Sequence, residues 1–125
     1  MYSKELAGQV LSKIERAIET IQERTEQVRD LNDFLTSPQG MEKLDAVCMQ
    51  LISIGESVKN LDKITERSLL PTYPEIPWKD VMGMRDIIAH HYFDLDAEEI
   101  WHILQFDLMP LLDAIRFLKN KLETD

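Results

Sequence analysis

The apolar residues of this 125-residue chain recur every three or four positions in long runs, and this spacing constrains the fold more than any other feature. Such spacing places the apolar side chains on one face of an α-helix, which must then pack against other helices. The alternation of apolar and polar residues that marks a half-buried strand does not appear. The pattern therefore predicts an all-α protein.

The first apolar run extends from Leu6 to Leu35, with one gap at Thr25, and it predicts one long amphipathic helix. A polar stretch containing Pro38 follows this run. Ser37 can cap the next helix by accepting a hydrogen bond from its first turn, where a proline is also well tolerated. The sequence therefore predicts that the first helix ends near residue 36 and that a second helix begins near Pro38.

The second run extends from Leu44 to about Ile64 and predicts a helix antiparallel to the first. An irregular stretch with three prolines follows at residues 67–77, and these prolines exclude a continuous helix there. We expect an ordered loop rather than a flexible one, because four of its apolar side chains would gain by contacting the bundle. These four residues are Leu69, Leu70, Tyr73 and Ile76.

A short third helix is expected from Pro77 or Trp78 to about His90 or His91. Asp96, with a glutamate three residues later, has the spacing of a capping box and predicts the start of a last helix, which Pro110 should kink. Four main helices with mostly short links predict an antiparallel helical bundle. The length fits one domain covering residues 1–125.

The composition narrows the setting in which the protein works. The chain is 44% hydrophobic, has no apolar run near the ~20 residues that span a bilayer, and shows no secretory signal pattern. Its single cysteine, Cys48, cannot form an internal disulfide. We therefore expect a cytoplasmic protein without a membrane partner.

The charge balance argues against a protein that coats nucleic acid. The formal net charge is −9, whereas binding along a phosphate backbone depends on lysine and arginine. A local RNA site needs only a few cations and remains compatible with this charge. The predicted location is a basic rim around the proline-rich loop, formed by Lys59, Lys63, Arg67 and Lys79.

One face of the predicted third helix carries groups that suit phosphodiester chemistry. At 100° per residue, Arg85, Asp86 and His90 share a broad polar face. Arginine offers a planar fork of donors to a phosphate, and histidine moves protons near neutral pH. Metal-independent RNA cleavage needs one group to accept a proton and another to donate one. Since one chain supplies one such pair, we hypothesise a composite site in a two-fold dimer.

Other interpretations of these residues are open on spacing alone. Arg85 and Asp86 can simply be solvated or salt-bridged on a helix surface. A metal site built from nearby histidines and aspartates is disfavoured because the zinc-like ligand spacing is missing and His90 and His91 point apart on a helix. The residues weighed for such a site are His90, His91, Asp94, Asp96 and His102. The chain also lacks a glycine-rich phosphate loop and a nucleophile elbow. The residues therefore imply no metal and no cofactor.

Residues 83–92, GMRDIIAHHY, resemble the signature of the HepT family within the HEPN superfamily, which has Arg, four residues, His, one residue and Tyr. Two further segments are similar to the family pattern in the same order. These are residues 45–56, containing ISIGE, and residues 73–78, YPEIPW. The resemblance covers roughly residues 45–110.

This resemblance implies a ribonuclease toxin of a type VII-like toxin–antitoxin system, acting as a homodimer on an RNA such as tRNA. Its implied partner is a minimal nucleotidyltransferase (MNT type) that serves as antitoxin. Arg85 and His90 match the catalytic pair, Asp86 matches a supporting position, and Tyr92 matches the tyrosine that the partner modifies with AMP. An adenylate there would add negative charge where an RNA phosphate must bind.

A second function remains open beside the first. The same bundle could be a non-catalytic HEPN subunit that binds nucleotide or substrate for a minimal nucleotidyltransferase.

Two residues of the second predicted helix are left out of the catalytic set. Gly55 indicates a close helix approach, and Glu56 is either solvated or orients a motif residue.

Overall fold

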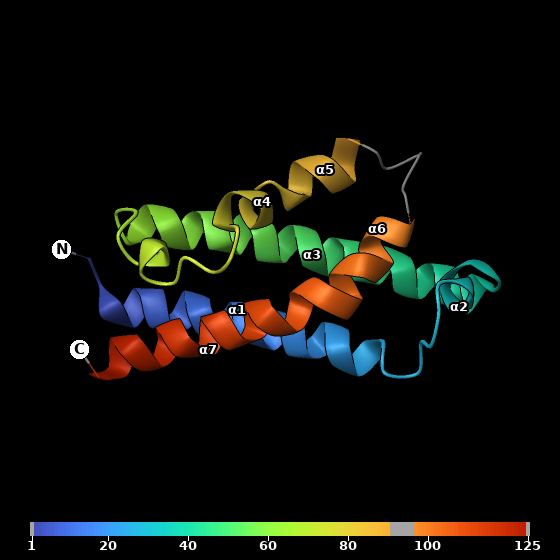
Figure 1. Ribbon diagram of the computed structural model, residues 1–125, viewed down its shortest axis with the longest axis horizontal. Helices are drawn as coiled ribbons and strands as arrows, with labels where there is room; N and C mark the ends of the chain where they lie inside the picture. The colour runs from blue at the N-terminus through green and yellow to red at the C-terminus, as the bar shows by residue number, and fades with distance from the viewer. Residues whose placement is uncertain (1, 91–96, 125) are drawn as a thin grey trace.

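The computed structural model describes residues 2–90 and 97–124, and every regular element in these ranges is helical, which confirms the all-α prediction. Figure 1 shows α1 (Lys4–Arg24) between two neighbours, α3 (Pro38–Ile64) and α7 (Leu108–Thr124), each antiparallel to it. The helices α4 and α5 cross the other side of α3. The result is an antiparallel bundle in which α3 separates the motif helix from α1.

The predicted single helix from Leu6 to Leu35 is wrong, because α1 ends at Arg24. The hydroxyl of Thr25 donates to the Ile21 carbonyl (2.8 Å) at the gap in the apolar pattern. Beyond it, the carboxylate of Asp33 accepts backbone N–H bonds of Arg29 (2.7 Å) and Asp30. Local side-chain bonds of this kind compete with the helical ladder. The chain turns and then forms only a short helix, α2 (Asn32–Leu35).

The second predicted helix is confirmed as α3. Its N-cap is Ser37, whose Oγ accepts the Gly40 N–H at 2.9 Å, and Pro38 occupies the first turn. After Ile64 the backbone adopts left-handed φ angles of 56° and 59° at Glu66 and Arg67, which ends the helix.

The proline-rich loop is ordered, as predicted, and includes the short 3₁₀ turn η1 (Leu70–Thr72). The four apolar residues that were expected to contact the bundle do so: Leu69, Leu70 and Ile76 are buried, and Tyr73 packs against the core. The indole Nε1 of Trp78 donates to the Tyr73 carbonyl at 2.9 Å. This bond ties the loop to the start of the next helix.

The third helix is not continuous. Gly83 separates α4 (Trp78–Met82) from α5 (Met84–His90) and serves as the C-cap of α4, where its N–H bonds back to the Lys79 and Val81 carbonyls. Glycine is the residue that stabilises a helix interior least, apart from proline. The motif therefore lies on a separate helix of two turns.

The last helical run consists of α6 (Ala97–His102), the π-helical turn η3 (Ile103–Asp107) and α7. The sequence predicts a kink at Pro110, and the irregularity that the structure shows is this π turn, which ends three residues before the proline. Pro110 has no N–H for the Phe106 carbonyl four residues earlier, and its ring crowds that carbonyl. The predicted N-cap Asp96 lies outside the described residues.

The core fills the space between the helices with aliphatic side chains, and Phe34 is the largest residue that is fully buried. Cys48 is also buried in this core, and burial raises the pKa of its thiol to about 11, so it stays protonated at neutral pH. None of the described helices combines the length and the apolar character that a membrane crossing needs.

Candidate functional site

The motif helix α5 lies on α3 through one apolar face. Met84 and Ile88 of this helix, and Val81 of α4, are buried, whereas Arg85 and Asp86 are exposed. The sequence predicted this division between an apolar and a polar arc. The structure therefore presents the arginine and the aspartate of the motif to solvent on the outer face of α5.

A glycine on α3 sets how closely the motif helix approaches. A Cβ atom at Gly55 would lie 2.8 Å from the Val81 carbonyl oxygen and 3.4 Å from the Cβ of Met84. The first distance is too short for a backbone contact, so any side chain here would push α4 and α5 away from α3. This geometry confirms the close helix approach that the glycine indicated.

The residue after this glycine contacts the motif directly. Glu56 Oε1 lies 3.4 Å from Arg85 Nε, and the two side chains are 48% and 60% exposed. An ion pair this exposed contributes roughly 0–1 kcal/mol. The carboxylate therefore orients the guanidinium without holding it firmly, and a phosphate could take its place. Sequence reasoning left Glu56 out of the catalytic set but raised this orienting role.

The structure describes the other two predicted site residues, His90 and Tyr92, only in part or not at all. His90 ends α5, five residues after Arg85, which corresponds to about 7.5 Å along the helix axis. Its side chain, and the whole of Tyr92, lie outside the described residues. The structure therefore fixes Arg85 and Asp86 and the backbone that carries His90.

The structure offers no metal centre among the residues it describes: nowhere in them do three His, Cys, Asp or Glu side chains gather around a common point. Of the residues weighed for a metal site, His91, Asp94 and Asp96 lie outside the described part of the chain. His102 is exposed, and its ring packs against Phe106 with centroids 4.8 Å apart.

The predicted basic rim has exposed side chains at all four of its positions, Lys59, Lys63, Arg67 and Lys79. None of them lines either of the two grooves that border α1. A role for this rim in RNA binding stays a prediction.

The chain is similar to known proteins over a range that includes the motif helix. The family model "Ribonuclease HepT-like" matches residues 14–118, which include α3, the proline-rich loop and α5. The chain belongs to the HepT-like family. The matched range begins within α1, so it covers more of the chain than residues 45–110, over which the sequence resembles the family.

Several relatives carry names that concern RNA. The chain is 35% identical over 110 residues to a probable ribonuclease HepT from Thermococcus cleftensis, covering 88% of this chain and 93% of that protein. It is 33% identical over 113 residues to a gamma-glutamylcyclotransferase and putative RNase from Methanocaldococcus jannaschii, covering 90% of this chain and 47% of that protein.

A putative RNase from Methanocaldococcus jannaschii is 42% identical over 59 residues, covering 47% of this chain and 46% of the relative. The matches thus span about half the length of two of these three relatives and nearly all of the HepT protein. No solved structure gives a significant match to the chain.

Proposed function

We propose that this HepT-like chain is a metal-independent endoribonuclease whose site is built around Arg85 and His90. The observation that carries the proposal is the state of Arg85: it is exposed on the motif helix, and among the described residues its one ion pair is with an exposed carboxylate at 3.4 Å. A guanidinium held in this way is available to a phosphate. The names of the relatives, which include a probable ribonuclease HepT, support RNA as the substrate.

The chemistry follows from the groups available. A 2′-hydroxyl of the RNA attacks the adjacent phosphorus while a neutral His90 imidazole accepts its proton. The P–O5′ bond breaks, and a protonated imidazole donates a proton to the leaving O5′, so that a cyclic 2′,3′-phosphate and a 5′-hydroxyl result. Arg85 stabilises the negative charge that develops on the phosphoryl oxygens, and Asp86 supports the arginine.

Two histidines serve this mechanism better than one, because one accepts a proton while the other donates. We therefore place the site in the cleft of a homodimer, where each copy supplies its own Arg85 and His90. The exposed outer face of α5 is compatible with such pairing. The dimer is part of the proposal.

Regulation is proposed through Tyr92, two residues beyond His90. A minimal nucleotidyltransferase acting as antitoxin would transfer AMP to its hydroxyl. The adenylate adds a phosphate charge and considerable bulk next to the site, which opposes the binding of an RNA phosphate. In this scheme the modified protein is the inactive form of a type VII-like toxin.

The test is cleavage of total RNA and tRNA in excess EDTA by purified protein that mass spectrometry shows to be unmodified at Tyr92. We expect the parent to cleave and Arg85→Ala and His90→Ala each to lose activity by about 100-fold or more. Arg29→Ala, an exposed arginine in the loop after α1, is the matched control and should retain activity. Absence of cleavage by unmodified parent would instead favour a nucleotide- or substrate-binding subunit of a nucleotidyltransferase.

A further inference from the structure

A groove of about 220 Å³ lies between α1 and α3. Two residues that line it are cations, Lys13 and Arg16, and none is acidic. The other lining residues are neutral: Ile14, Ala17, Thr20, Gln50, Ser53, Ile54 and Ser57. In a chain of net charge −9, a groove with two cations and no carboxylate is a local reversal of the overall charge.

The cations of this groove are free because their acidic neighbours on α1 are already engaged. Arg116 of α7 binds Glu15 at 3.0 Å and Glu19 at 3.1 Å, and Lys119 binds Glu15 at 2.9 Å. Among the described residues, neither Lys13 nor Arg16 has a carboxylate within 4 Å. Both can therefore receive an anion from outside the chain.

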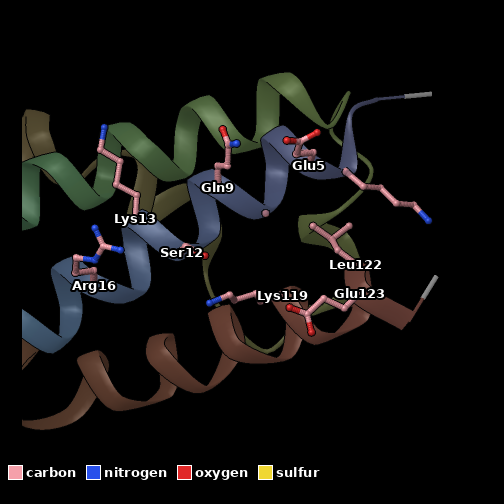
Figure 2. A pocket seen from close by; sticks show the side chains of 10 residues that line it. Glu5, Gln9, Ser12, Lys13, Arg16, Lys119, Leu122 and Glu123 are labelled. Carbon is pink, nitrogen blue, oxygen red and sulfur yellow. The ribbon is translucent and has the colours of Figure 1, made fainter.

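A second, larger groove lies on the other side of the same two cations. It has about 690 Å³, runs between the start of α1 and the end of α7, and also includes Lys13 and Arg16 (Figure 2). Figure 2 shows Lys13 directed away from α7, toward α3. Glu5 and Glu123 line this second groove, so its charge is mixed. The groove between α1 and α3 is the better site for a polyanion.

The neutral side chains of the α1–α3 groove are also available. Gln50, Ser53 and Ser57 make no side-chain hydrogen bond within the described part of the chain, and they recur at three and four residues, which aligns them along one stripe of α3. Hydroxyl and amide groups beside lysine and arginine are the donors that bind phosphate and sugar oxygens in nucleic-acid complexes.

One residue of this stripe lies near the motif. Ser53 precedes Glu56 by three residues, so the two side chains are neighbours on the surface of α3, and Glu56 contacts Arg85. A strand lying in the groove could therefore cross the outer face of α3 and reach the arginine. Ser53 is thus the residue that connects the groove of Lys13 and Arg16 with Glu56, the contact of Arg85.

We propose that the α1–α3 groove binds the sugar–phosphate backbone of the RNA strand that is presented to Arg85. Lys13 and Arg16 neutralise phosphates, and Ser53 and Ser57 donate to phosphate or sugar oxygens. The inference rests on the proposed ribonuclease function for the identity of the polyanion. Under this proposal the main RNA contact is the α1–α3 groove, on the opposite edge of α3, and not the basic rim that the sequence predicts around the proline-rich loop.

The test measures binding separately from cleavage. A short, fluorescein-labelled, single-stranded 2′-O-methyl RNA lacks the attacking hydroxyl, so it cannot be cut, and its binding to the full chain is followed by anisotropy at several salt concentrations. We expect Lys13→Gln/Arg16→Gln to bind about 10-fold more weakly and to lower the salt dependence, the slope of log K against log salt, by about 1.4.

The matched control is Arg29→Gln/Lys43→Gln, which removes one arginine and one lysine, both exposed, from positions that line neither groove. It should bind nearly as the parent does. Equal affinity and salt slope for the groove variant and the control, or no binding by the parent, would overturn the inference. Groove-dependent binding without cleavage of ordinary RNA would retain the groove and reject the nuclease.

Discussion

Two helix contacts in this molecule each join an arginine to a glutamate, and they differ in how the pair is used. Between α1 and α7, Arg116 reaches both Glu15 and Glu19, and Lys119 adds a third short contact. Between α3 and α5, Arg85 makes one exposed ion pair, at 3.4 Å, within the described ranges, beside a glycine that allows the helices to approach closely. In the α1–α7 contact, the cations and carboxylates pair with one another. In the α3–α5 contact, close backbone packing holds the helices together, and the guanidinium of Arg85 remains available to an anion.

The largest effect should come from Gly55→Ala, because the α3–α5 contact depends on backbone proximity. The new Cβ would meet the Val81 carbonyl at 2.8 Å. Overpacking of this kind costs about 1–3 kcal/mol, and the better helix propensity of alanine returns at most about 1 kcal/mol. We expect a net loss of about 1–2 kcal/mol in urea unfolding, with a larger proportional loss of RNA cleavage because the motif helix is displaced.

Gly8→Ala is the matched control for this substitution. A Cβ at Gly8 on α1 would have no neighbour within 4 Å, so alanine there should raise the free energy of unfolding by about 0.5–1 kcal/mol. Stabilisation by both substitutions would mean that α5 is not held in place by the close approach at Gly55.

A smaller effect is expected at the α1–α7 contact. Hydrogen bonding to Lys119, followed by that to Arg116, keeps the pKa of Glu15 below its usual value of 4.5. Glu15→Gln should therefore lower the free energy of unfolding by roughly 0.5–1 kcal/mol at neutral pH. A depressed pKa stabilises the fold above about pH 4.5, and that contribution is lost as pH falls through the folded-state pKa.

The stabilities of parent and Glu15→Gln should thus converge in acid, which denaturant unfolding at a series of pH values can measure. Glu23→Gln, on the exposed face of the same helix, removes a carboxylate that makes no ion pair with any residue the structure describes, so it should follow the parent throughout. A constant difference between parent and Glu15→Gln down to pH ~2 would contradict the ionic origin of this contribution.

The smallest effect on stability should come from Glu56→Gln. Its ion pair with Arg85 is exposed, so the free energy of unfolding should change by less than about 0.5 kcal/mol. Removing the carboxylate frees Arg85, however, and RNA should bind a few-fold more tightly in the anisotropy assay. Unchanged or weaker RNA binding by this variant would show that Glu56 positions Arg85 rather than competing with the phosphate.

Sequence reasoning located the helices that have strong local signals. The N-cap at Ser37 and the apolar stripe of α3 are both local patterns, and they gave the helix its correct limits. The buried and exposed arcs around Arg85 followed from helical periodicity alone. The first helix was predicted too long because the apolar spacing resumes after Thr25, while the bonds of Asp33 to the loop backbone decide the break.

The parts of the site that sequence could not supply depend on contacts between distant segments. Nothing near Lys13 in the chain indicates that Arg116, about a hundred residues away, occupies the neighbouring glutamates and leaves the cation free. The pairing of Glu56 with Arg85 similarly requires α5 to lie on α3. The break at Gly83 had a local signal, but helical spacing on both sides of the glycine concealed it.

The close approach at Gly55 also affects how a genetic screen of this protein should be interpreted. If the chain is the toxic ribonuclease proposed above, a selection for survivors would recover substitutions at Gly55 together with those at Arg85, although glycine contributes no functional group. Every other amino acid adds at least one carbon where α3 meets Val81. A map of inactivating mutations would therefore mark this position as part of the active site, and only the folded stability of each variant would separate a displaced motif helix from a missing reactive group.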